Sequence, residues 1–464
     1  MAKYKQLANQ FVLEIEQGRR KEGSKMPSLR QLARQYSVSM STAVNCYQEL
    51  ESQGWIHASP QSGFFVTVQP LLHSIPEWVT FESKVTQIPK TVIERAARSF
   101  NQAGPLGVSS APIDELTRLE LERSFRRGVS RTGNYLEEYP DHQGSLFLRQ
   151  AVTKHLARAN FPFSAEQVVI TEGCMAAIKL ALESCTRAGD TVAISSPCFN
   201  GILELLALME RKIIEIPSNK DGIDLEQLER HLDTGLLNAA VFCTSHMNPQ
   251  GITMTVAQKQ KLASLANQHQ VPIIEDDVYL ELSHLPEPPL PAKYYDEGGY
   301  ILWCSSISKT LSPSYRLGWC LPGRFIHRYK NQVGLSTYGI SLPVQAAIGD
   351  FIESGSYAKH LTKQCHQLRI NKKEYTDYLL QRLGDRVKIS APQGGMVLWL
   401  QVPTLDVKAF RHAVESIQLD IRLGDLFSTL NLYDDCFRVN FGYPLEGKAL
   451  DALDTLVHLI IRSS

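Results

Sequence analysis

The first residues of the chain show the apolar spacing of a helix. Leu7, Phe11 and Ile15 are separated by four positions, so they lie on one face of a helix predicted over residues 2–17. The polar residues between them would face water. This is the pattern of a surface helix that packs against a small core.

Two shorter helices and a hairpin are predicted after it, within the first 68 residues. Ser28 can cap a helix that starts at Leu29, and after a tight turn a further helix starts at Ser41 and ends at Gly54. The stretch WIHASPQSGFFVTV then predicts two strands around a Pro–Gln–Ser–Gly turn. Two short helices with a wing-like hairpin are typical of a winged helix-turn-helix, whose second helix reads a DNA groove. An ordinary helical cap on an enzyme is the alternative.

From about residue 110 the pattern changes to short apolar runs that alternate with amphipathic helices. The runs are VVIT (168–171), TVAISS (191–196), AAVFCTS (239–245) and VPIIEDD (271–277). Buried strands that alternate with helices predict a parallel α/β sheet. Ligands of such sheets bind at the carboxyl ends of the strands.

Composition and charge refine this two-part pattern. The 464 residues sum to zero net charge, but residues 1–68 carry eight Lys or Arg against five Glu. A small basic part attached to a neutral body is one way to place nucleic-acid affinity at one end. Residues 69–110 contain prolines and one helical piece, over residues 91–100, and predict a linker.

The composition also argues against a secreted or membrane protein. No apolar run approaches the roughly 20 residues of a membrane span, and the first 25 residues lack the apolar core of a signal peptide. The nine cysteines are scattered without a CxxC pair, which disfavours a disulfide framework or a zinc site. We therefore expect a cytoplasmic protein with free thiols.

Three stretches that follow predicted strands carry candidate ligand-binding groups. ITEGCMAAIKLAL places the N–H groups of Gly173, Cys174 and Met175 at the start of a helix, where a phosphate is favoured. SSPCFNG places Phe199, and SHMNPQG places Asn248, after the next strands. Each has an ordinary alternative: a common strand–glycine–helix junction, a core aromatic and a turn.

Two further stretches carry titratable groups. IIEDDVYLEL places Asp276 and Tyr279 after a buried run, where a carboxylate is costly without a cationic partner. SSISKTLSPSYRLGW places Lys309 among hydroxyls and Arg316 seven residues later, which suits a nucleophilic amine near a phosphate. A surface lysine in a polar loop is the alternative. The acidic residues here lack further ligands at metal-binding spacing, so no metal is expected.

The order of these stretches resembles the fold type I pyridoxal phosphate enzymes of the aspartate aminotransferase group, over about residues 110–464. PSLRQLA, VSMSTAVNCYQELESQGWI and SGFFV resemble the winged helix-turn-helix of GntR-type regulators. A GntR-type head fused to such a body is the layout of the MocR subgroup. The resemblance implies a DNA-binding domain (1–68), a linker (69–110) and an aminotransferase-like body (111–464). The body would have a large α/β domain to about residue 340 and a small α+β domain after it.

The resemblance implies pyridoxal 5′-phosphate as the cofactor, and a role for each matching residue. Lys309 would bind the cofactor aldehyde and Asp276 the pyridine nitrogen. Asn248 and Tyr279 would bond the phenolic oxygen, while Phe199 would stack on the ring. The catalytic set would be Lys309, Asp276 and Tyr279. The residues expected to hold the phosphate are Gly173, Cys174, Met175, Ser306, Ser308 and Arg316.

Three further positions bear on the ligand and on assembly. Tyr139 matches a family tyrosine that reaches the phosphate of the neighbouring subunit, so the resemblance implies a homodimer. Arg438, in FRVNFGY, matches the arginine that binds the α-carboxylate of the ligand. Two departures concern the ligand: Phe199 replaces a tyrosine of many relatives, and Gly201 replaces an arginine of some. Both leave the ligand's side chain open.

In the head, the resemblance implies contacts with double-stranded DNA. The residues expected to approach it are Arg30, which would bind a backbone phosphate, and Ser39, Ser41, Thr42 and Gly63. Met40 stands where the family often has arginine and cannot make the bidentate contact to guanine. We therefore expect an operator that differs from the commoner ones.

Together these inferences predict a transcriptional regulator that senses an amino compound. An amine or amino acid would displace Lys309 from the cofactor, shift the dimer and reposition the heads. A working aminotransferase with a DNA-binding head is one alternative, because the catalytic set is complete. A DNA-binding protein that keeps the body only as a dimerisation scaffold is another.

Overall fold

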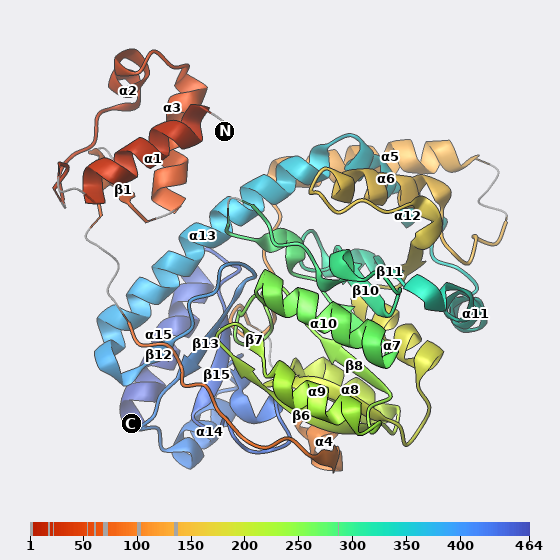
Figure 1. The fold of residues 1–464 in the computed structure, drawn as a ribbon. Helices are drawn as coiled ribbons and strands as arrows, with labels where there is room; N and C mark the ends of the chain where they lie inside the picture. Colours follow the sequence, from red (N-terminus) through yellow and green to blue (C-terminus); the bar gives the residue numbers. More distant parts are fainter. Residues whose placement is uncertain are drawn as a thin grey trace.

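The computed structural model describes residues 3–16, 19–21, 23–52, 54–59, 62–67, 73–99, 104–133, 138–285 and 287–464. A small helical head lies beside the long helix α13 (Ser356–Leu383), and the rest of the chain forms the body (Figure 1). Within these residues, no helix is both long and apolar enough to cross a membrane. All nine cysteines are free thiols.

The head is built from α1 (Lys3–Glu16), α2 (Leu29–Gln35), α3 (Met40–Ser52) and the hairpin β1 (Ile56–Ser59)–β2 (Gly63–Val66). Its core contains Phe11, Leu32 and Tyr47, each fully buried. Ser28 and Gln31 form a reciprocal cap at the start of α2. Helix α3 starts one residue before the predicted Ser41, because the Ser39 side chain accepts a hydrogen bond from the Thr42 N–H at 3.1 Å. These elements form the winged helix-turn-helix that the sequence predicts.

The large sheet of the body has the order β3-β6-β5-β8-β9-β10-β11-β4 in the described residues, with β7 paired to β6. Strands β6, β5, β8, β9 and β10 run parallel, whereas β11 inserts antiparallel between β10 and β4. The bounds are β3 (Val85–Gln87), β4 (Val169–Thr171), β5 (Thr191–Ser196), β6 (Lys212–Asn219), β7 (Gly222–Ile223), β8 (Ala239–Phe242), β9 (Ile273–Asp276), β10 (Ile301–Ser306) and β11 (Gly318–Leu321).

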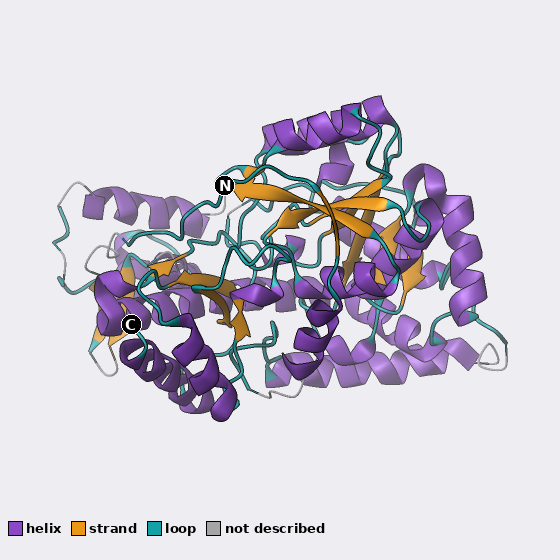
Figure 2. Cartoon of the chain, turned by 90° about the horizontal axis from the view of Figure 1, so that it is seen from below, coloured by secondary structure: helices purple, strands orange, loops and turns teal. Residues whose placement is uncertain are grey.

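Helices cover both faces of this sheet (Figure 2). Within β5, Val192 and Ile194 pack with α7 (Cys174–Cys185), α8 (Asn200–Leu208) and α11 (Ile326–Thr337). Ala193 faces the other way and packs with α9 (Leu225–Asp233) and α10 (Val256–His269). This alternation explains why the strands read as continuous apolar runs, since both faces of each strand are buried.

The C-terminal part adds a second sheet, of antiparallel strands in the order β12-β13-β15-β14. The strands are β12 (Lys388–Ile389), β13 (Val397–Gln401), β14 (Arg422–Leu423) and β15 (Cys436–Asn440), with α14 (Val407–Ser416) and α15 (Gly447–Arg462). The remaining long helices are α4 (Lys90–Ser99), α5 (Glu115–Thr132), α6 (Leu146–Ala157) and α12 (Leu342–Glu353). Asp350 of α12 pairs with Arg127 at 2.7 Å and Arg131 at 2.8 Å, which ties α12 to α5.

Short 3₁₀ helices complete the body: η2 (Ala165–Gln167), η3 (Leu280–Leu282), η4 (Ala292–Tyr295), η5 (Pro313–Tyr315), η6 (Gly323–Phe325), η7 (Gly384–Arg386) and η8 (Gly424–Leu426).

Much of the segment that the sequence predicts as a linker lies against the body. Strand β3 pairs antiparallel with β6 at the edge of the large sheet. The Ser74 carbonyl accepts a hydrogen bond from the Ile389 N–H at 2.9 Å, and the Ser83 N–H donates to Gln227 Oε1 at 2.8 Å. Residues 104–114, which we call the connecting segment, enter the body between the two sheets.

Candidate cofactor-binding site

A cavity of about 170 Å³ opens at the carboxyl ends of the parallel strands. Side chains reach it from the start of α7 and from the loops after β5, β8, β9 and β10. The predicted site residues that line it are Cys174, Met175, Phe199, Asn248, Asp276, Tyr279, Ser306, Ser308, Lys309 and Arg316. The topology therefore brings together residues that are up to 142 positions apart, from Cys174 to Arg316.

Lys309 lies in the turn that follows β10, with its amine directed into the connecting segment. Its Nζ donates a hydrogen bond to the Ser109 carbonyl oxygen at 2.7 Å. Burial, together with the nearby Arg438 guanidinium, lowers the pKa of Lys309 from 10.5 to about 8, although Asp276 acts in the opposite direction. A larger share of this amine is therefore neutral and nucleophilic near neutral pH than for an ordinary lysine.

Asp276 is the last residue of β9 and is 8% exposed. Burial raises the pKa of its carboxyl group to about 6, against the opposing effects of a hydrogen bond from Cys174 and the charge of Lys309. The Cys174 Sγ donates to Oδ1 at 3.4 Å, which is a weak contact for a buried carboxylate. A cationic N–H placed in the cavity would satisfy this carboxylate and lower its pKa.

The side of the cavity formed by the start of α7 and by Arg316 suits an anion. Helix α7 begins after Gly173, whose φ is +86°, so its first N–H groups are free of helical partners. Arg316 lies against this turn, and its Nη2 donates to the Glu172 carbonyl at 3.0 Å. A Cβ on Gly173 would stand 2.9 Å from that nitrogen. Glycine is therefore required both for the backbone and for the close approach of the guanidinium.

Arg438, on β15, is buried close to the cavity. Its Nη1 donates to Asn248 Oδ1 at 2.9 Å, and its Nη2 donates to the Gly107 carbonyl. Its Nε is buried without a hydrogen-bond partner among the described residues. Burial lowers the pKa of Arg438 to about 10. A guanidinium with neutral acceptors and a spare donor is suited to bind a carboxylate.

The connecting segment is the part of the site that the sequence patterns do not predict. Its Gly107 and Ser109 carbonyls accept hydrogen bonds from Arg438 and Lys309. The Gly107 N–H donates to Asp420 Oδ2 at 3.0 Å, and a Cβ at this glycine would stand 2.1 Å from Asp420 Oδ1. Backbone carbonyls have no side-chain signature, so the required glycine is the one available signal.

Three cysteine thiols also line the cavity, and Gly201 packs against the Phe199 ring. The thiols are Cys174, Cys198 and Cys243, and burial raises the pKa of each well above its ordinary value. A Cβ on Gly201 would stand 2.6 Å from the Phe199 ring. The Phe199 ring can therefore adopt this position only because residue 201 has no side chain.

Tyr139, a predicted contact of the cofactor phosphate, lies away from the cavity in this single chain. Tyr139 is 87% exposed and does not line the cavity. The role that the resemblance implies for it requires a second copy of the chain, so it stays a prediction.

The predicted DNA contacts all belong to the head. Ser39, Ser41 and Thr42 surround the start of α3, where the Ser39 hydroxyl lies 2.9 Å from that of Ser41 and 2.8 Å from that of Thr42. Arg30 is exposed on α2. Met40 is 47% exposed at the first position of α3. Gly63 begins β2 with a φ of +100°, which a glycine adopts without strain.

Comparison with known proteins assigns a family to the body and another to the head. The family described as "Aminotransferase class I and II" matches residues 108–446, and "Bacterial regulatory proteins, gntR family" matches residues 3–66. The chain is 34% identical to the uncharacterized HTH-type transcriptional regulator YdcR of Escherichia coli (strain K12), over 99% of both chains. It is 30% identical to YjiR, described in the same terms and from the same strain, over 100% of both.

Several solved structures with the fold of the body are aminotransferases. The multiple substrate aminotransferase from Thermococcus profundus superposes with a TM-score of 0.71 at 21% identity, covering 80% of this chain and 94% of its own. The α-aminoadipate aminotransferase LysN from Thermus thermophilus, complexed with N-(5′-phosphopyridoxyl)-L-leucine, gives 0.70 at 18% identity, covering 81% and 96%. These likenesses show the fold and confirm the predicted fold class.

The chain thus combines a GntR-type head with an aminotransferase body of fold type I. It belongs to the MocR subgroup of GntR-type regulators, as its motifs predict.

Proposed function

We propose that this chain is a pyridoxal 5′-phosphate-dependent transcriptional regulator that senses an amino acid or related amine through its body and binds double-stranded DNA through its head. One observation carries the proposal: a complete winged helix-turn-helix shares a chain with a cavity in which Lys309, Asp276 and Arg316 meet. Regulation of chromosomal DNA implies that the protein works in the cytoplasm.

The polar groups around the cavity fit the proposed cofactor. Asp276 would hold a proton at the pyridine nitrogen, and the first N–H groups of α7 with Arg316 would bind the phosphate. Phe199 would lie against the ring. When bound, pyridoxal phosphate supplies an aldehyde that reacts reversibly with primary amines and a ring that withdraws electrons. Lys309 supplies the amine that a ligand's amine would replace.

Arg438 is the proposed site for a carboxylate of the ligand. Its present acceptors, Asn248 and the Gly107 carbonyl, are neutral. A carboxylate would replace a neutral acceptor with a charged one, which makes a stronger hydrogen bond. Because Gly107 belongs to the connecting segment, a ligand that contacts both Lys309 and Arg438 would displace that segment. This favours ligands that carry an amine and a carboxylate.

A functional aminotransferase with a DNA-binding head is the second candidate. The observation that favours it is that Lys309, Asp276 and Tyr279 all line one cavity. Multiple turnovers of an amino acid and a keto acid, with no effect of either on DNA binding, would support this function over sensing. A homodimer is proposed for both functions, since Tyr139 is exposed and its implied contact lies in a neighbouring subunit.

The rate at which the cofactor-free protein takes up pyridoxal phosphate is expected to depend on pH through Lys309. The reaction needs the neutral amine, so the rate rises about tenfold per pH unit below the pKa and levels off above it. With the pKa of Lys309 lowered to about 8, the rate is expected to be half-maximal at about pH 8 and to reach its plateau about one pH unit higher. Stopped-flow absorbance measures this profile. A rate that still rises beyond about pH 9.5, like that of free lysine, would contradict the altered pKa.

The test of the proposed function measures both activities in one preparation. DNA is the tightest duplex selected from a random pool, and binding is followed by fluorescence anisotropy while visible absorbance follows the cofactor. Amino acids are added singly. We expect at least one to shift the absorbance and to change the DNA affinity about fivefold or more. Spectral shifts without any change in DNA binding, for every amino acid, would contradict sensing.

Replacing Arg30 with alanine separates DNA binding from the cofactor site. Losing one phosphate contact is expected to weaken DNA binding about tenfold and to reduce the slope of log affinity against log salt by about 1. The absorbance response is expected to stay unchanged, because Arg30 is exposed on the head. If the slope of log affinity against log salt stayed unchanged in Arg30→Ala, Arg30 would not be a DNA contact.

A further inference from the structure

Helix α13 contacts the immediate neighbour of Lys309. The Tyr357 hydroxyl donates to Thr310 Oγ1 at 2.7 Å, and His360 Nε2 lies 2.8 Å from the Thr310 carbonyl oxygen. All three residues are nearly fully buried. The first turns of α13 are therefore fixed to the loop that carries Lys309.

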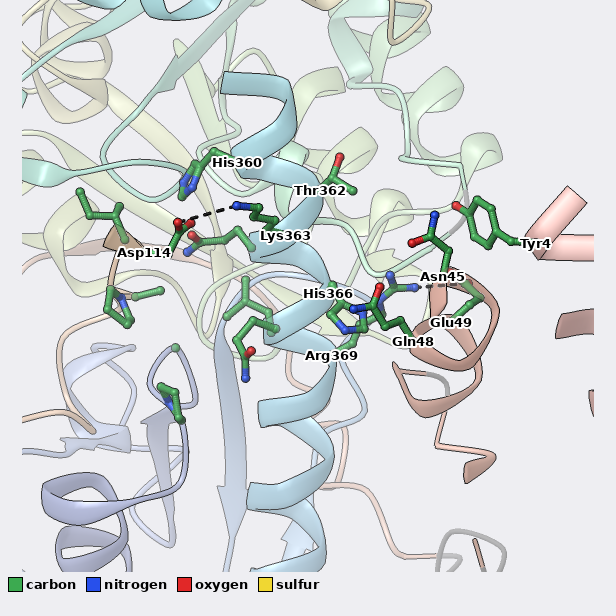
Figure 3. Close-up of a pocket in the computed structure, with 18 residues that line it drawn as sticks. Tyr4, Asn45, Gln48, Glu49, Asp114, His360, Thr362, Lys363, His366 and Arg369 are labelled. Carbon is green, nitrogen blue, oxygen red and sulfur yellow. Dashed lines mark ion pairs between the residues drawn. The ribbon is translucent and has the colours of Figure 1, made fainter. Parts of the chain in front are cut away.

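The same helix contacts the DNA-reading helix of the head further along. Arg369 of α13 and Glu49 of α3 form an ion pair at 3.6 Å, in which their side chains are 18% and 9% exposed (Figure 3). One turn later, Lys373 packs beside Gly54, where a Cβ would stand 3.1 Å from Lys373 Cε. From His360 to Arg369 a straight helix rises about 14 Å. One continuous helix thus joins the Lys309 loop to α3.

The contact between head and body encloses a cavity beside this ion pair. The cavity has a volume of about 700 Å³, with Tyr4, Asn45 and Gln48 on the head side and Lys363 and His366 on the body side (Figure 3). This cavity is larger than the cofactor cavity. A cavity at this contact leaves the head room to change its position on the body.

The connecting segment reaches this cavity as well. Its Ser109 carbonyl accepts the hydrogen bond from Lys309, and its Asp114 lies 3.7 Å from Lys363 of α13 at the cavity wall. Asp114 also caps α5 through the Thr117 N–H at 3.1 Å. Movement of Lys309 can therefore reach the space under the head by two routes, each through a hydrogen bond: one to Ser109 of the connecting segment and one from Thr310 to α13.

We propose that α13 and the connecting segment transmit the state of Lys309 to the head, and that the Glu49–Arg369 ion pair is the contact through which the head responds. This inference rests on the proposed function. In the loaded protein the Lys309 nitrogen would be bonded to the cofactor. A ligand's amine would free it to donate to the Ser109 carbonyl, as it does in this structure, and the loop that bears Thr310 would shift against α13. Arg369 then changes its distance from Glu49, and α3 turns relative to the body. Arg369 is a positioning residue: it acts on DNA binding through Glu49.

The test uses the full-length protein loaded with pyridoxal phosphate, and aminooxyacetate as the probe. This molecule carries a strongly reactive amine and a carboxylate, so it displaces Lys309 without turnover. We expect it to change the DNA affinity of the wild type about fivefold or more. In Arg369→Gln the change is expected to fall below about twofold, while the visible spectral response keeps its wild-type amplitude.

Matched variants isolate the ion pair. Arg382→Gln alters the same helix at an arginine that pairs with Asp454 of α15 at 2.7 Å, and it is expected to keep the full response. The double exchange Glu49→Arg with Arg369→Glu is expected to restore part of the response that Arg369→Gln loses. Hydrogen exchange over residues 45–52 should rise with the probe in the wild type and stay constant in Arg369→Gln.

Failure of the inference and failure of the proposed function give different results. A wild type without any spectral response to aminooxyacetate contradicts the cofactor proposal itself. A spectral response with no change in DNA affinity or in hydrogen exchange of α3 overturns the transmission proposal. An Arg369→Gln variant that responds like the wild type shows that the ion pair only docks the head, and it too overturns the proposal.

Discussion

Replacing Lys309 with alanine is expected to remove the visible absorption of the reconstituted protein completely after desalting. The amine that would hold the cofactor is lost, and no other lysine lines the cavity within the described residues. Alanine also removes the hydrogen bond to the Ser109 carbonyl. Borohydride reduction of the wild type, followed by peptide mass spectrometry, should place the label on Lys309.

The matched control is Lys179→Ala, on the exposed side of α7. It removes a lysine of the same helix that provides the proposed phosphate site, and it is expected to keep the full absorption. Unfolding measured by circular dichroism shows whether either variant is destabilised. A label on another lysine, or full absorption in Lys309→Ala, would contradict the assignment of this residue.

Replacing Leu32 with alanine is expected to abolish DNA binding while the body keeps its cofactor site. Leu32 is fully buried in the core of the head. Truncating a buried leucine costs about 2–5 kcal/mol, and a head of roughly 60 residues has only about 3–9 kcal/mol of stability. DNA binding by fluorescence anisotropy should therefore be lost or weakened by more than about tenfold.

The matched control is Leu13→Ala on α1, where the side chain is 53% exposed and truncation is expected to cost little. Visible absorbance should be normal in both variants, and calorimetry should show an early transition only in Leu32→Ala. Loss of the cofactor signal together with DNA binding would mean that head and body unfold as one cooperative unit.

The sequence predicts the sheet and its strand-end residues well, for a physical reason. Strands buried on both faces are continuously apolar, so their ends are visible where polar residues begin, as at Asp276 at the end of β9 and Ser306 at the end of β10. Parallel strands bring such ends to one edge of the sheet. The cavity at this edge contains both residues together with Lys309.

Features that depend on contacts between residues far apart in the chain could not be predicted from the local sequence patterns. Strand β11 lies antiparallel between β10 and β4, a pairing that no local period indicates. The carbonyls of Gly107 and Ser109 belong to a segment predicted only as a linker. The contact of Glu49 with Arg369 joins positions 320 residues apart, each of which looks locally like a surface charge.

The three thiols in the cavity wall have a consequence for chemical selectivity. Sulfur is ordinarily the better nucleophile toward a carbonyl when it is ionised. Here burial holds Cys174, Cys198 and Cys243 in their protonated form, while the same enclosure favours the neutral amine of Lys309. A single physical cause, the loss of water around the cavity, thus keeps the three thiols protonated and unreactive and makes the Lys309 amine more nucleophilic. The cavity would accept amines as ligands and leave its own thiols unreacted.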